Sequence, residues 1–527
     1  RAVKLVLSSS AETEAGAVDS LGGGLPVCVR WSRWERMAER FGTPAYVYDA
    51  DEIAARAGTL RSVLPGGGAT RLYYSFKANP LPSVAAEARS GGCEADLTSP
   101  GEIDAALAAG YDLGRALYGG PGKSEAEYEH ALARGIGHFS IESEADLSRL
   151  DAAAGRLGVQ AKALLRINPQ TPPKAKLAMA GVASQFGFEE DFLASEGRRM
   201  LASLGANVEI VGFHLYWGTQ IGDPEALLAS FTKTVETVAE LAAGLGIGVD
   251  ILNFGGGFPW PYAHGGEGPD LSSLREGLDR LRRGSGAVGE AEWWFESGRG
   301  VVASCGTLLT RVMEIKQSKD DRQFLILDTG IHHLGGMSGL GRIPRFSVEL
   351  IVPPGRRDRQ TLFVDVVGQL CTPLDCIGKK IEIPRVEAGD LLAIPNVGAY
   401  GLTASVTGFL SRPAPAEVLH RGDEVIAAHR LRTGHETLPP RDLTVNTMAS
   451  PISLEAVEAV VRPHLRFLSA ADPLGSGQNL GALGLDSMAS IDLLLDLENA
   501  FDVSISDDDL TENSFSNLEE IRKLVGG

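Results

Sequence analysis

The chain of 527 residues is too long for one ordinary hydrophobic core, so two or three domains are expected. Its formal net charge of −19 argues against nucleic acids and anionic membrane surfaces as partners. The sequence contains no apolar run long enough to span a bilayer. Five cysteines without a C-x-x-C pair favour a reducing compartment, and we therefore expect a cytoplasmic protein.

Strands and helices alternate through the first part of the chain. Residues 1–33 form an N-terminal segment with few structural signals, which could add strands to a neighbouring domain. Over residues 34–300 a strand followed by a helix recurs about eight times in roughly 250 residues, the pattern of a (β/α)8 TIM-like barrel. The expected strands are 72–75, 93–97, 116–118, 138–141, 163–167, 209–215, 249–254 and 292–296.

The rhythm changes after residue 300. Strands without intervening helices, including 308–315, 345–351 and 391–394, predict a mostly-β domain over residues 301–430. Residues 431–450 contain Pro439-Pro440 and few apolar residues, so we expect a linker. Residues 451–527 return to helical patterns, and residues 450–527 hold 14 acidic against 4 basic residues.

Lys77 lies at the end of an apolar, aromatic-rich strand in Leu72–Pro80, and Pro80 forbids the continuation of that strand. Catalytic side chains point from this end of barrel strands. Partial desolvation would disfavour the ammonium and leave a nucleophilic amine, which a Schiff base with an aldehyde cofactor requires. A strand-end lysine that points into water is the alternative.

Three further strand ends carry residues with matching chemistry. Successive glycines at Gly255, Gly256 and Gly257 would let backbone N–H groups approach a phosphate, although plain turns use the same residues. The carboxylate of Glu296 could hold a protonated pyridine nitrogen, or it could form a surface salt bridge. His214 could stack on a flat ring, or simply pack in the barrel.

Residues 34–430 resemble the fold-type III decarboxylases that use pyridoxal 5′-phosphate (PLP), the group of diaminopimelate and ornithine decarboxylases. The resemblance is carried by an ordered set of motifs: Tyr74–Asn79, His214 with Gly218-Thr219, Gly255–Pro259, Glu296 with Gly298-Arg299, Cys371 with Asp375, and Gly398-Ala399-Tyr400. It implies a homodimer in which the two subunits share their active sites. Racemases of the same fold typically place an arginine, and not a carboxylate, at the pyridine nitrogen.

The resemblance also implies roles for individual residues. Lys77 would form the imine with PLP, Glu296 would face the pyridine nitrogen and His214 would stack on the ring. Cys371 would reach in from the partner subunit as the acid that protonates the substrate carbon, the alternative being a small buried hydrophobe. The residues implied around the cofactor are Lys77, Asp96, Arg166, His214, Thr219, Gly255, Gly256, Gly257, Glu296, Gly298, Arg299 and Tyr400.

The substrate positions depart from the family pattern. Ornithine and diaminopimelate enzymes carry an acidic residue after the cysteine, and here it is Thr372; the ornithine enzymes' aspartate corresponds to Thr329. We expect Thr329, Thr372 and Asp375 to contact substrate. A diamine-forming substrate is disfavoured because its buried ammonium would lack a carboxylate. The adjacent His332-His333 pair has poor geometry for a metal, and no metal site is expected.

Leu483–Met488 opens an amphipathic helix in the last domain. With the helical patterns at 454–467 and 518–525, this domain resembles a small four-helix acyl carrier protein. The resemblance implies that Ser487 bears 4′-phosphopantetheine. An acidic helical interaction module is the alternative.

The sequence therefore predicts an α/β protein made of a barrel, a mostly-β domain and an acyl-carrier-like domain. We expect a PLP-dependent decarboxylase of glutamate or aspartate thioesterified to its own carrier, in natural-product biosynthesis. Two alternatives are a decarboxylase of a free amino acid, and a non-catalytic carrier or docking protein. The expected partners are an amino acid ligase, a phosphopantetheinyl transferase, and a downstream synthase or acyltransferase.

Overall fold

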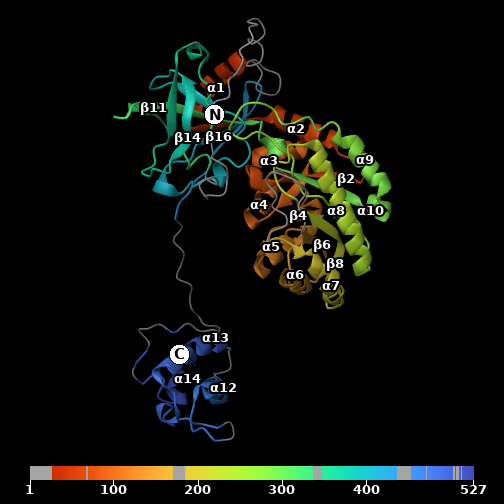
Figure 1. Cartoon of the computed structure of the whole chain (residues 1–527), viewed down its shortest axis with the longest axis vertical. Helices are drawn as coiled ribbons and strands as arrows, with labels where there is room; N and C mark the ends of the chain where they lie inside the picture. The colour runs from red at the N-terminus through yellow and green to blue at the C-terminus, as the bar shows by residue number, and fades with distance from the viewer. Residues whose placement is uncertain are drawn as a thin grey trace, which may run out of the picture. The chain divides into compact units, whose positions relative to one another are not determined.

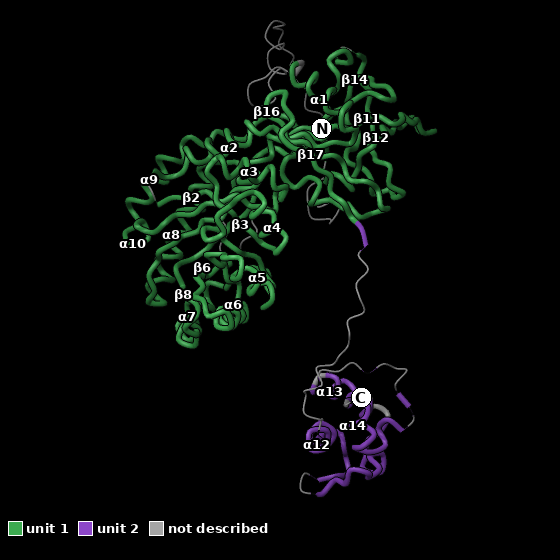
Figure 2. The backbone as a smooth tube through the Cα atoms, turned by 180° about the vertical axis from the view of Figure 1, so that it is seen from behind, with its two compact units in different colours: residues 1–433 green, residues 434–527 purple. Residues whose placement is uncertain are grey.

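The computed structural model of the chain divides into two compact units, Arg1–Thr433 and Gly434–Gly527, which Figure 2 shows in different colours. The residues that the structure describes are 27–66, 69–169, 184–335, 347–357, 359–435, 453–469, 472–501, 505, 510–511 and 513–526. Among them, no helix is both long and apolar enough to cross a bilayer.

Eight parallel strands of the first unit close into a barrel. They follow the order β5-β4-β3-β2-β10-β9-β8-β6, and pairing between β5 and β6 completes the ring. The strands are β2 (Thr70–Ser75), β3 (Glu94–Leu97), β4 (Leu117–Tyr118), β5 (His138–Ile141), β6 (Ala161–Asn168), β8 (Val208–Leu215), β9 (Ile251–Asn253) and β10 (Glu292–Ser297). The predicted (β/α)8 barrel is confirmed, and its eight strands lie where the sequence pattern placed them.

Helices lie outside the ring of strands (Figure 1). They are α2 (Ala50–Val63), α3 (Pro82–Ser90), α4 (Pro100–Ala108), α5 (Glu125–Ala133), α6 (Glu144–Leu157), α7 (Glu190–Ala202), α8 (Pro224–Leu245), α9 (Leu274–Gly284), α10 (Gly286–Glu290) and α11 (Arg299–Val302); the short β7 (Phe188–Glu189) pairs with β6. Their ends carry ordinary stop and start signals. In α8, the Asp223 side chain accepts from the Glu225 N–H, Pro224 occupies the first turn, and Gly246 ends the helix with φ 74°.

Apolar side chains fill the barrel interior on the amino-terminal side of Lys77. They come from six of its strands and form a cluster separate from the main core: Tyr73, Leu117, Leu164, Val211, Ile251 and Trp294. The rings of Tyr73 and Trp294 lie 4.7 Å apart. Because this layer closes the barrel, the open end lies at the carboxyl ends of the strands, where a site can form.

The second sheet follows the order β14-β13-β12-β11-β1-β16-β17, with β15 also paired to β11. Its strands are β1 (Ala45–Asp49), β11 (Gly306–Gln317), β12 (Gln323–Leu327), β13 (Thr361–Val367), β14 (Cys376–Pro384), β15 (Leu391–Ile394), β16 (Ala416–Arg421) and β17 (Glu424–Arg430). Figure 1 shows α1 (Val27–Phe41) beside this sheet. The mostly-β domain is thereby present.

Two details of the domain prediction are wrong. The barrel was expected to begin at residue 34, but β1 is paired antiparallel with β11 and parallel with β16, so the chain enters the barrel only after β1. A strand was expected at 345–351, yet residues 347–350 are irregular and only Ile351 bridges to Ala393. The sheet instead obtains strands from β14, β16 and β17.

The second unit contains α12 (Leu454–Val461), α13 (Ser487–Phe501) and α14 (Leu518–Gly526) among its described residues. Its own core includes Val457, Leu493, Leu497 and Ile521, all fully buried. The three helical segments that the sequence predicted are therefore present. The expected linker, residues 431–450, falls mostly outside the described residues.

Candidate active site

Lys77 follows β2 directly, in the short 3-10 turn η1 (Phe76–Ala78). The turn is anchored on its far side by Asn79, whose Nδ2 donates to the Gly398 carbonyl at 3.0 Å and whose Oδ1 accepts from the Leu81 N–H at 3.1 Å. Phe76 and Ala78 are buried, whereas the Lys77 side chain is exposed within a cavity. The turn therefore fixes the base of the lysine and leaves its amine accessible.

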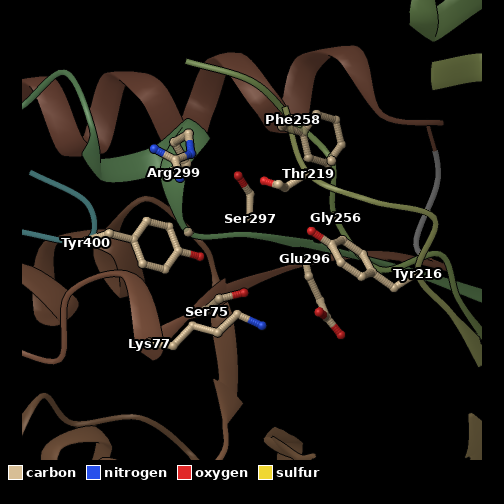
Figure 3. Close-up of a pocket in the computed structure, with 12 residues that line it drawn as sticks. Ser75, Lys77, Tyr216, Thr219, Gly256, Phe258, Glu296, Ser297, Arg299 and Tyr400 are labelled. Atoms are coloured by element: carbon tan, nitrogen blue, oxygen red, sulfur yellow. The ribbon is translucent and has the colours of Figure 1, made fainter. Parts of the chain in front are cut away.

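One cavity at the carboxyl ends of the strands gathers most of the predicted cofactor residues (Figure 3). Figure 3 shows Lys77 and Glu296 toward one end, Arg299, Ser297 and Thr219 toward the other, and Tyr400 between them. The lining residues are Ser75, Lys77, Tyr216, Thr219, Gly256, Gly257, Phe258, Glu296, Ser297, Gly298, Arg299 and Tyr400. Eight of these belong to the set that the sequence named.

The end that contains Arg299 offers hydrogen-bond donors without partners. The Ser297 hydroxyl and the Arg299 Nε are buried, and no described group pairs with either. A side chain at Gly256 would approach the Glu296 carbonyl to 2.8 Å, and Gly257 has φ +119°, so both positions require glycine. Close backbone and free donors together suit an anion such as a phosphate.

Tyr400 comes from the β domain and is held against the barrel at three points. Its N–H donates to the Ala78 carbonyl at 2.7 Å, and its own carbonyl accepts from the Tyr262 hydroxyl at 2.8 Å. The Arg299 guanidinium lies 4.8 Å from the Tyr400 ring centre. The φ of Tyr400 is 55°, in the left-handed region, and these contacts maintain that strained conformation.

Glu296, at the end of β10, is 7% exposed and accepts a hydrogen bond from a neutral amide. Its Oε1 accepts from the Asn253 Nδ2 at 2.8 Å and lies 3.4 Å from the His214 Nε2. The other ring nitrogen of His214 contacts the Ser140 hydroxyl at 2.9 Å. Burial first, then the positive charges of Arg166 and Lys77, hold the pKa of His214 well below its usual value. His214 is therefore neutral beside the carboxylate.

The charge state of Lys77 differs from the sequence-based expectation. Burial lowers the pKa of its amine, but the nearby Asp96, Tyr400 and Glu296 outweigh that effect and raise it overall. Burial and then the Glu296 charge raise the pKa of Asp96 to about 7, although Lys77 opposes them. Lys77 is thus an ammonium in this arrangement. Among the described groups, one buried oxygen of Asp96 has no hydrogen-bond partner.

Arg166, Asp96, His214 and Gly255 were expected around the cofactor, but they are not among the residues that line this cavity. Arg166 donates to Glu142 at 2.7 Å, and Glu142 also accepts from the Gly187 N–H at 2.8 Å. Direct cofactor contacts by these four residues stay a prediction.

The predicted substrate residues lie on the β domain, outside the cavity lining of the described chain. Cys371 is exposed, whereas Thr329 is fully buried, with its hydroxyl 3.3 Å from the His333 Nδ1. Asp375 is 2% exposed, and its carboxylate accepts from the Ile331 and Leu370 N–H groups at 2.9 and 2.7 Å. The structure gives Asp375 a role in holding the cysteine loop. Substrate contacts by Cys371, Thr372 and these residues stay predictions.

Sequence reasoning missed several residues of the site. Ser75, Tyr216, Phe258 and Ser297 line the cavity, and Asn253 contacts Glu296. Each lies at or within a few positions of a strand end that the sequence had already identified. Inspecting every side chain at those strand ends would have found them.

Ser487 is the first residue of α13. The preceding Asp486 accepts from the Ala489 N–H at 2.9 Å and pairs with Arg466 at 2.6 Å. The serine predicted to carry phosphopantetheine therefore lies at the capped N-terminus of a helix of 15 residues. The dipole of such a helix suits a phosphodiester.

Comparison with known proteins agrees with this arrangement. The model of the pyridoxal-binding domain of pyridoxal-dependent decarboxylases matches residues 50–303, and that of the phosphopantetheine attachment site matches residues 465–524. The chain is similar to an L-glutamyl-[BtrI acyl-carrier protein] decarboxylase of Niallia circulans, with 33% identity over 73% of this chain and 90% of the relative. A diaminopimelate decarboxylase of Zymomonas mobilis is 32% identical over 76% of this chain and 92% of its own.

Solved structures give the same answer. Diaminopimelate decarboxylase from Helicobacter pylori, complexed with L-lysine, superimposes with a TM-score of 0.65 and 28% identity, over 74% of this chain and 95% of that one. The chain therefore belongs to the pyridoxal-dependent decarboxylases. It is a carbon–carbon lyase that also carries a C-terminal phosphopantetheine-attachment domain.

The cavity fits PLP. An amine and a carboxylate at one end suit the aldehyde and the pyridine nitrogen, and the unpartnered Ser297 hydroxyl and Arg299 Nε at the other end suit the phosphate. The glycines there leave room for backbone contact with an anion.

Proposed function

We propose that this protein decarboxylates an amino acid whose side-chain carboxyl is thioesterified to phosphopantetheine on its own carrier domain. One observation carries the proposal: a pyridoxal-binding decarboxylase domain and a phosphopantetheine-attachment domain occupy the same chain. The Niallia relative is named for a glutamyl group on an acyl carrier protein, which supports the same substrate class. The product would be an amine on the carrier, a building block for natural-product biosynthesis.

PLP, when bound, supplies an electron sink for the electron pair that remains when CO₂ leaves. Lys77 would hold the cofactor through its amine. Glu296 would stabilise a protonated pyridine nitrogen, and His214 packs as a neutral ring beside that carboxylate. Thr219, Arg299 and the glycine loop would bind the phosphate.

The two threonines at the substrate positions favour an amino acid without a second charge. Burying the second ammonium group of a diamino acid without a carboxylate partner would cost several kcal/mol of binding free energy. Thr372 and Thr329 supply none, and the Asp375 carboxylate already accepts two backbone N–H groups. Glutamate or aspartate linked through its side-chain carboxyl has no such charge. These acids would give the 4-aminobutyryl-carrier and the β-alanyl-carrier respectively.

The connection between the units supports delivery within the protein. The chain between Arg430 and Leu454 can span at most roughly 3.3–3.6 Å per residue. Because the carrier belongs to the same chain as the barrel, a substrate attached to Ser487 would stay covalently linked to the decarboxylase.

Further partners follow from the same proposal. The protein acts as a homodimer in which Cys371 of one subunit protonates the substrate carbon bound to the other. A phosphopantetheinyl transferase modifies Ser487, an amino acid ligase loads the arm, and a synthase or acyltransferase removes the product. The protein would work in the cytoplasm.

Intact-protein mass spectrometry tests the proposal. Phosphopantetheinylated protein is loaded with glutamate or aspartate through the side-chain carboxyl, and its mass should fall by one CO₂. The Lys77→Ala variant, loaded in the same way, should keep its mass. Free glutamate, aspartate, ornithine and diaminopimelate are compared in parallel.

The second candidate is a decarboxylase of a free amino acid with a carrier that serves another enzyme. The similarity to diaminopimelate decarboxylases favours it. If a free diamino acid is turned over as well as any loaded one, the tethered proposal is wrong and this candidate replaces it.

A further inference from the structure

Asn253 is the last residue of β9 and is fully buried next to the cavity. Its Nδ2 donates to the Glu296 Oε1 at 2.8 Å, and its Oδ1 accepts from the Gly255 N–H at 2.8 Å. One side chain therefore links the carboxylate at one end of the cavity to the glycine loop that leads to the other end.

The neighbouring backbone fixes the orientation of this amide. The Gly255 N–H can only donate, so the amide oxygen must face it, and the NH₂ group must face Glu296. A backbone hydrogen bond links β10 to the glycine loop at the same point, since the Glu296 N–H donates to the Gly255 carbonyl at 2.8 Å. Glu296 accordingly meets a hydrogen-bond donor that cannot lose its proton.

We propose that Asn253 is a positioning residue that holds the Glu296 carboxylate in the orientation needed to face the pyridine nitrogen of PLP. The proposal rests on the role proposed above for Glu296, but not on whether the substrate is tethered. Asn253 acts through Glu296 and does not itself touch the reacting atoms.

An amide suits this place better than an acid because the site already concentrates charge. Lys77 from η1, Asp96 from β3 and His214 from β8 all lie near Glu296 or interact with it electrostatically, and Arg166 from β6 acts on Asp96 and His214. A second carboxyl group at hydrogen-bond distance from Glu296 would have to carry a proton, since two adjacent carboxylates cannot both ionise. Only in that protonated form would it replace the amide donor.

Two substitutions separate positioning from a structural role. Asn253→Leu keeps the approximate size and removes both hydrogen bonds. Asn253→Asp keeps the acceptor for Gly255 and regains the donor to Glu296 only at low pH. The matched control is Asn207→Asp, because Asn207 makes a similar amide-to-carboxylate bond to Asp151, 3.2 Å long, next to the start of β8.

The readout is the affinity of the cofactor-free, full-length protein for PLP, measured by absorbance titration at about pH 6 and about pH 9. We expect Asn253→Leu to bind about tenfold more weakly than the parent at both pH values. Asn253→Asp should bind within about twofold of the parent at low pH and at least about tenfold more weakly at high pH. Asn207→Asp should match the parent throughout.

Parental affinity of both Asn253 variants at both pH values would overturn the proposal. So would equal weakening of Asn253→Asp at low and high pH, because the protonated acid should restore the donor. Recovery at low pH also shows that the variant is folded. A Glu296→Ala variant separates the role proposed for Glu296 from the role proposed for Asn253. If the PLP affinity and absorbance spectrum of Glu296→Ala match those of the parent, the role of Glu296 is wrong. If only the Asn253 variants match the parent, the role of Asn253 alone is wrong.

Discussion

Glu417 is a buried acid outside the active site, and its removal should stabilise the first unit in a pH-dependent way. It is 6% exposed on β16, and the Tyr48 hydroxyl donates to it at 3.1 Å. Burial raises the pKa of Glu417 from 4.5 to about 7, and the Tyr48 bond opposes the shift only in part. Because the folded-state pKa lies above the unfolded one, the associated stability is present below pH 4.5 and is lost as the pH rises through about 7.

The magnitude follows from the shift. Moving a carboxyl pKa from 4.5 to about 7 corresponds to roughly 3 kcal/mol when the group is fully ionised. Glu417→Gln keeps a partner for Tyr48 and removes the charge. We expect it to raise the free energy of unfolding on the order of 2 kcal/mol more at about pH 8 than at about pH 5.5.

Denaturant unfolding followed by tryptophan fluorescence measures this difference. The six tryptophans are Trp31, Trp34, Trp217, Trp260, Trp293 and Trp294, so the signal reports on the first unit alone. Glu424→Gln, an exposed acid on the neighbouring β17, serves as the control and should show no comparable pH dependence. A Glu417→Gln effect that is the same at both pH values would refute the reasoning.

Three further predictions concern the site and the carrier. Ser297→Ala removes a buried, unpartnered hydroxyl and should weaken PLP binding about tenfold in a titration; unchanged affinity would remove Ser297 from the phosphate site. Ser487→Ala should abolish attachment of phosphopantetheine and turnover of loaded substrate, whereas Ser490→Ala, one turn along the same helix, should leave both intact by mass spectrometry. Asp375→Asn replaces an acceptor of two backbone N–H groups and should lower kcat by disturbing the Cys371 loop, with PLP affinity unchanged. A loss of PLP affinity would instead show that Asp375 supports the cofactor cavity.

The barrel and most of its site were predictable because they depend on local patterns. Each barrel strand is a short apolar run followed by a helix with its own capping residues, and the chemistry-bearing residues lie where those runs stop. Lys77, Glu296 and Arg299 could be identified one at a time on that basis. The cavity then brings them together with Tyr400 from the other domain.

Features that depend on distant pairings could not be predicted. Nothing in the local sequence shows that residues 45–49 pair with Gly306–Leu309 and with residues 416–420. The protonation of Lys77 was expected to follow burial alone. It instead follows the charges of Asp96 and Glu296, whose positions depend on strands β3 and β10 lying on either side of β2.

Asn253 shows a similar limit. In the sequence it is one polar residue at the end of a buried strand, and an amide there has no distinctive signal. Its importance appears only when β9 and β10 are paired and its side chain is found between Glu296 and Gly255.

The most direct test of the account is where PLP attaches to the protein. PLP-loaded protein is reduced with borohydride and digested, and the labelled peptide is identified by mass spectrometry. We expect a label on Lys77 and no label in Lys77→Ala. A label on Lys123, a buried lysine of the barrel unit, or no label at all would contradict the assignment of the active site.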